Sequence, residues 1–143
     1  MKPGSPQRGF MLLEVLVAIV ILALGVLGAV GLQARATAAL SNAGARADAT
    51  IAAEKLVGMM WTDQANLASY AYNSAGGGGV PVALTDWVQE TQAQLPNATF
   101  LITVTPAAAP STASQVSVTL GWTRRSGETA NTHTIVATLA PTS

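Results

Sequence analysis

The chain contains no cysteine and very little charge. The missing cysteines exclude disulfides, cysteine-ligated zinc and thiol catalysis, so a folded domain must be stabilised by core packing. Only 10% of the residues are charged, against roughly 25% in ordinary soluble domains, and the formal net charge is zero. Arg124 and Arg125 form the only basic cluster. Nucleic-acid binding through a charged face, which needs several basic residues together, is therefore not expected.

The usual combinations of catalytic residues are also missing. His133 is the only histidine and lies among threonines in a predicted strand, while three Asp and four Glu are scattered along the chain. Residues 76–79 are a glycine run, but the Lys-Ser/Thr and helix start of a phosphate-binding loop do not follow. We therefore expect no enzyme, no metal site and no cofactor.

The N-terminal third carries the strongest signal. Residues 1–9 form a short polar leader with Lys2 and Arg8, and Glu14 is the only charged residue among residues 10–32. As a helix this run would be about 35 Å long, enough to cross a hydrocarbon core of about 30 Å. The positive-inside rule places the leader in the cytoplasm and the rest of the chain outside it. At 143 residues the chain has room for this helix and one small head domain.

Three simpler interpretations compete for this run: a secretory signal peptide, a plain membrane anchor and a buried soluble helix. The run is long for a signal peptide, and no clear Ala-x-Ala cleavage site precedes the polar region. None of the three explains Glu14, because a carboxylate inside an apolar helix is costly and needs a partner. A free α-amino group at Phe10 would be such a partner, and it exists only if the leader is removed.

The segment Arg8 to Ala18, R-G-F-M-L-L-E-V-L-V-A, resembles the class III signal of type IV prepilins and type II secretion pseudopilins. Met11 stands where that family often has Thr. The resemblance implies that a prepilin peptidase cuts between Gly9 and Phe10, that Phe10 is then N-methylated, and that Glu14 guides assembly. It also implies contacts with major and minor pilins through the N-terminal helix. The protein would first lie in the bacterial inner membrane with a periplasmic head, and then in a filament at the cell surface.

The pattern of the remaining residues predicts that the helix continues and is followed by one small head domain. Residues 33–61 continue the helix as an amphipathic segment whose apolar end should pack under the head, and residues 62–83 form a Gly-rich loop. Within residues 84–143 we expect a short helix, with Thr85 or Asp86 as its cap, followed by an antiparallel meander of about three strands. The apolar end comprises Leu56, Met59, Met60 and Trp61; the short helix places Leu84, Trp87, Val88, Thr91 and Leu95 on one face. The predicted class is α+β and pilin-like.

The pattern of the head makes the resemblance more specific, because it is similar to one group of pilins. A short helix with a central Trp87 and ending in Leu95-Pro96, and a later strand ending in Gly121-Trp122, look like PilV-type minor pilins. That group implies a minor pilin that assists assembly, initiation or modification of a type IV pilus. A minor pseudopilin of a type II secretion system and a plain membrane-anchored binding module remain alternatives. Many pilins close the C-terminal region with a disulfide loop, which this chain cannot do.

Overall fold

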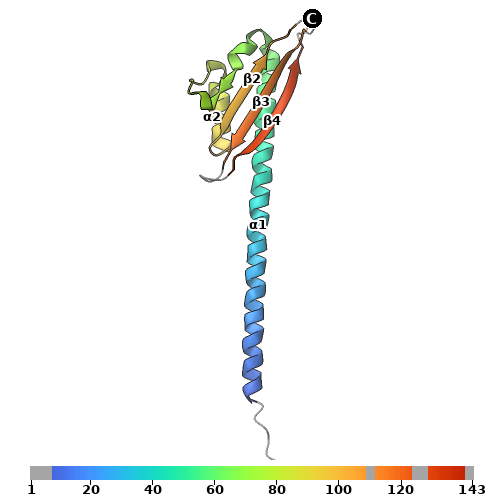
Figure 1. Ribbon diagram of the computed structural model, residues 1–143, viewed down its shortest axis with the longest axis vertical. Coiled ribbons are helices and arrows are strands. Elements are labelled where there is room, and N and C mark those ends of the chain that lie inside the picture. Colours follow the sequence, from blue (N-terminus) through green and yellow to red (C-terminus); the bar gives the residue numbers. More distant parts are fainter. Residues whose placement is uncertain (1–7, 109–111, 124–128, 141–143) are drawn as a thin grey trace, which may run out of the picture. The chain divides into compact units, whose positions relative to one another are not determined.

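The computed structural model describes residues 8–108, 112–123 and 129–140 (Figure 1). The chain forms two compact units, Met1–Asn42 and Ala43–Ser143, and helix α1 belongs to both. In order, with η for a 3-10 helix, the elements are α1 (Arg8–Thr62), η1 (Gln64–Tyr70), β1 (Tyr72–Asn73), η2 (Ser74–Gly76), η3 (Val82–Leu84), α2 (Thr85–Gln94), β2 (Thr99–Thr105), β3 (Ser114–Trp122) and β4 (Asn131–Leu139). The expected α+β, pilin-like architecture is confirmed.

The described part of the first unit is helical throughout. No proline interrupts the 55 residues of α1, and the expected continuation beyond residue 32 without a break is confirmed. The helix begins at Arg8, two residues before the expected start. By length and composition α1 can cross a membrane: its most apolar 18-residue window has a mean hydropathy of 3.0, and none of that window is buried.

The second unit is built on one face of the last turns of α1. The buried residues of this face follow the three- and four-residue spacing of a helix stripe: Ala49, Ala52, Ala53, Leu56 and Met60. Three of the five are alanines, which let other elements approach the helix backbone closely. The expected burial of Leu56 and Met60 is confirmed. Trp61 was expected to pack with them, but it lies on another face and is 43% exposed.

Helix α2 packs through the face that the sequence predicted. The five residues predicted to face inward are all buried, although Leu84 and Leu95 lie just outside α2, which ends at Gln94 and so before Pro96 as expected. The expected cap by Thr85 or Asp86 is wrong, because η3 runs directly into α2 and leaves Leu84 at the cap position without a side-chain bond. The Trp87 ring meets the Phe100 ring edge-on, with centroids 5.3 Å apart, and so joins α2 to the sheet.

The sheet has four antiparallel strands in the order β1-β2-β3-β4, one more than expected. The three long strands lie side by side in Figure 1, with β4 outermost. Their pairing is regular, so alternate residues face the core as the sequence predicted. The inward residues of β3 are all buried: Val116, Val118, Leu120 and Trp122.

The segment 62–83 is not a simple loop, and this correction adds a strand to the sheet. Its two buried side chains, Leu67 and Tyr70, lie on η1, and the two residues of β1 pair with β2. The polar composition predicted a loop because these core contacts are made with residues far away in the chain. The longest stretch of this segment without regular structure is 77–81, and Gly77 there has a φ of 71°, which favours glycine.

Candidate functional site

The three residues expected to control processing and assembly lie in the first two turns of α1. Gly9 and Phe10 follow Arg8, where the helix begins, and Glu14 is four residues beyond Phe10. Residues separated by four positions lie on the same face of a helix, about one turn apart. The structure therefore places the Glu14 carboxylate one turn from the backbone nitrogen of Phe10. The earlier leader residues, including Lys2, lie outside the described part of the chain.

The surroundings of Glu14 are entirely apolar. Phe10 is 81% exposed, and large aliphatic side chains are exposed along the same stretch: Met11, Leu12, Leu13, Val15, Leu16, Val17, Ile19, Val20, Ile21 and Leu22. Glu14 is itself exposed, and no ion pair in the described residues involves it. A monomeric soluble protein rarely exposes so continuous an apolar surface. This stretch of α1, which exposes apolar side chains on all sides, is therefore suited to lipid or to other apolar helices.

In these surroundings the Glu14 carboxylate can form an ion pair with one positively charged group. At the bilayer centre an unpaired charged side chain costs about 3 kcal/mol, whereas a pair 4 Å apart gains roughly 4 kcal/mol at an effective dielectric constant of 20. A chain starting at Phe10 would carry an α-amino group at the positive end of the helix dipole, where a carboxylate is favoured. Both that amine and the amine of a neighbouring chain are then possible partners for Glu14.

In the described part of the head, the titratable residues do not group into a second site. Among the described residues no three His, Asp or Glu side chains group closely enough to hold a metal ion. His133, expected to be structural or exposed, is half-buried on the inner face of β4, with Nε2 3.3 Å from the Thr50 hydroxyl of α1. This contact connects the edge strand to the helix. Arg124 and Arg125 lie outside the described residues.

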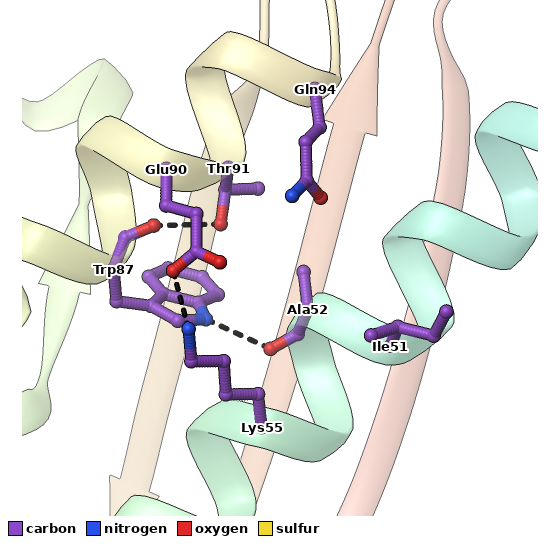
Figure 2. Close-up of a pocket in the computed structure, with 7 residues that line it drawn as sticks. All are labelled: Ile51, Ala52, Lys55, Trp87, Glu90, Thr91 and Gln94. Carbon is purple, nitrogen blue, oxygen red and sulfur yellow. Dashed lines mark hydrogen bonds and ion pairs between the residues drawn. The ribbon is translucent and has the colours of Figure 1, made fainter.

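A small cavity between α1 and α2 has a structural role instead (Figure 2). Its volume of about 30 Å³ leaves space for little more than one water molecule. Lys55 and Glu90 form an ion pair across its rim, with both side chains half exposed. Behind them the Trp87 indole N–H donates a 2.8 Å hydrogen bond to the Ala52 carbonyl oxygen. Sequence reasoning identified Trp87 as a core residue but had no signal for its main-chain partner.

The comparisons with known proteins place a motif on the same N-terminal segment. The family model of the prokaryotic N-terminal methylation motif matches residues 4–30, which include Gly9, Phe10 and Glu14. No curated protein and no solved structure matches the chain significantly. The motif implies processing by a prepilin peptidase and assembly with other pilins, and the apolar helix fits an anchor in the inner membrane. The motif, which covers residues 4–30, and the α+β, pilin-like fold support a type IV pilin-like or pseudopilin protein.

Proposed function

We propose that this chain is a minor pilin that takes part in the assembly, initiation or modification of a type IV pilus. The peptide bond between Gly9 and Phe10 is cut, Phe10 is methylated, and the apolar part of α1 moves from the membrane into a helix bundle. The observation that carries this proposal is Glu14, one carboxylate on an exposed apolar helix within the matched motif. Its charge is tolerated in that bundle because a neighbouring chain supplies the Phe10 amine.

The minor role rests on features of the head. Helix α2 carries Trp87 and ends just before Leu95-Pro96, and β3 ends in Gly121-Trp122; the resemblance to PilV-type minor pilins depends on these features. The C-terminal strand is held by pairing with β3 and by the burial of Leu139, in a chain without a disulfide. These features support a small head carried on a pilin helix.

Mass spectrometry of the protein extracted from membranes of its native host tests the first step. We expect a mature chain that begins at Phe10 and carries one additional methyl group on its amine. An intact leader, Met1 to Gly9, would contradict the proposal and would favour a plain membrane-anchored module.

The same motif also serves pseudopilins, so a pseudopilus of a type II secretion system is the second candidate. Deletion of the gene separates the two, because loss of surface filaments with normal secretion supports the pilus. Loss of secretion with normal filaments supports the pseudopilus.

A further inference from the structure

The outer edge of β4 has none of the features that usually prevent a strand from pairing with another protein. The strand is nine residues long, and its register with β3 is continuous from Ser114↔Leu139 to Trp122↔Asn131. It contains no proline and no Lys, Arg, Asp or Glu. Natural edge strands are normally protected by charge, proline, a bulge or short length. The described residues form no fifth strand beside β4, so the backbone groups along its outer edge remain available.

The opposite edge of the same sheet is closed by this chain itself. Strand β1 pairs with residues 101 and 102 of β2, although it is only two residues long. Next to it, the Ser74 hydroxyl accepts a 2.9 Å hydrogen bond from the Phe100 amide. The sheet therefore has one protected edge and one open edge, and pairing with another protein is expected at β4.

The inward face of β4 is also less well buried than the inward face of the neighbouring strand β3. The inward residues of β3 at positions 116, 118 and 120 are completely buried. On β4 the inward residues Ile135 and Ala137 are only half-buried, and Val136 on the outer face is 58% exposed. A further strand beside β4 would bury these apolar side chains and would also form hydrogen bonds with the backbone groups along its outer edge. Cross-strand side-chain pairs of this kind each contribute some tenths of a kcal/mol.

We propose that β4 accepts an antiparallel strand from the head of a different pilin-type protein, which extends this sheet; this inference rests on the proposed function. The partner strand is uncharged and rich in β-branched residues, because a charged side chain would lose hydration against β4 without gaining an ion pair.

A second copy of this chain does not fit the open edge. In the second unit, α1 and β4 run in the same direction, since Thr50 contacts His133 and Gln64 donates to the Ala140 carbonyl oxygen. Two β4 strands paired antiparallel would therefore direct their α1 helices in opposite directions, whereas anchored copies enter the membrane from the same side. The opposite edge of a second copy is its own β1, which is only two residues long and cannot pair along the nine residues of β4. The partner is consequently a different chain, with a longer edge strand that runs opposite to its own N-terminal helix.

The experiment uses the full chain, produced from its own gene in the native host, with lysine placed on the edge strand. Val136→Lys puts a charge on β4, and Leu101→Lys is the matched control on β2, where Leu101 is 43% exposed on the same sheet face but has strands on both sides. For Val136→Lys we expect the ratio of protein in sheared filaments to protein in membranes to fall at least fivefold, with unchanged leader removal. Leu101→Lys should leave this ratio within twofold of the wild type.

A second measurement reports on the edge directly and takes advantage of the absence of cysteine. In an otherwise wild-type chain, Ala137→Cys places a thiol on the half-covered underside of β4. A maleimide should label it at least fivefold more slowly in filaments than in membranes, while Leu101→Cys should react equally in both.

Three outcomes would overturn the proposal. Entry of Val136→Lys into filaments in wild-type amounts, with equal Ala137→Cys labelling in both pools, would leave the pilin function intact but remove the edge contact. A disulfide-linked dimer of the Ala137→Cys chain would show self-pairing instead of a different partner. A wild-type chain found only in membranes would refute the proposed function, and the edge pairing would fall with it.

Discussion

The indole N–H of Trp87 donates a hydrogen bond to the main-chain carbonyl of Ala52, 35 residues earlier in the sequence. This bond fixes α2 against α1, and the small Ala52 side chain permits the approach. Trp122, the other buried tryptophan, differs from Trp87 because its Nε1 has no partner among the described residues. The two residues therefore provide a matched pair for measuring what the Trp87 bond contributes.

We predict that Trp87→Phe destabilises the protein more than Trp122→Phe. Both changes remove ring volume from the core, but only the first removes a hydrogen bond, and a net bond is worth about 1 kcal/mol. We expect losses of about 3 kcal/mol for Trp87→Phe and about 1–2 kcal/mol for Trp122→Phe. Urea denaturation of the full chain in detergent, followed by circular dichroism, gives both values. Equal losses would show that the bond to Ala52 contributes nothing.

Gly121 is required by a close approach between β2 and β3. A Cβ atom at this position would lie 2.4 Å from the Thr99 hydroxyl oxygen, on the strand opposite. We expect Gly121→Ala to reduce the free energy of unfolding by about 1–2 kcal/mol through overpacking. Thr99→Ala removes the obstructing oxygen, so the double variant should recover about 1 kcal/mol of that loss. Additive losses in this cycle would contradict the steric explanation.

Tyr70 is predicted to make the head less stable at alkaline pH. Burial raises the pKa of Tyr70, and the hydrogen bond from its hydroxyl to Asp63 and the negative charge of Asp63 raise it further. The folded-state pKa thus lies above the unfolded value of about 10. The stability that the protonated Tyr70 hydroxyl contributes is therefore complete below about pH 10. It is lost as the pH rises through the folded-state pKa.

Measurements of unfolding free energy between about pH 8 and about pH 11.5 test this prediction. The wild type should lose more stability than Tyr70→Phe over the alkaline part of this range, because phenylalanine has no proton to release. Parallel curves for the two proteins would rule out a role for Tyr70. Asp63→Asn should reduce the difference without abolishing it, since burial is the largest cause of the shift.

Glu14 is predicted to be needed for assembly and not for cleavage. Glu14→Ala and Glu14→Gln should both be cut after Gly9, yet their amounts in sheared filaments should fall at least tenfold. Tenfold corresponds to about 1.4 kcal/mol, less than the roughly 4 kcal/mol available to a close ion pair at an effective dielectric constant of 20. Glu54→Ala is the control, because Glu54 is an exposed glutamate of the same helix outside the apolar run. Normal filament amounts of the Glu14 variants would contradict the assembly role.

Much of the architecture could be predicted because it depends on local patterns. The apolar run with a single Glu14 and no proline predicts α1, and period-two alternation predicts β2, β3 and β4. The same reasoning failed for β1 and η1, whose polar and glycine-rich surroundings predict a loop. Their structure depends on contacts of Leu67 and Tyr70 with distant parts of the core, which no local pattern records.

The sequence by itself determined the membrane-length helix, its lone carboxylate and the motif around Gly9 and Phe10, because these features follow from residue type and spacing along one element. Only the tertiary structure decided which face of α1 is buried, that Trp87 bonds to Ala52, and that β1 covers β2 while β4 remains an open edge. Those properties depend on which segments meet in space, and side chains far apart in the chain determine that together.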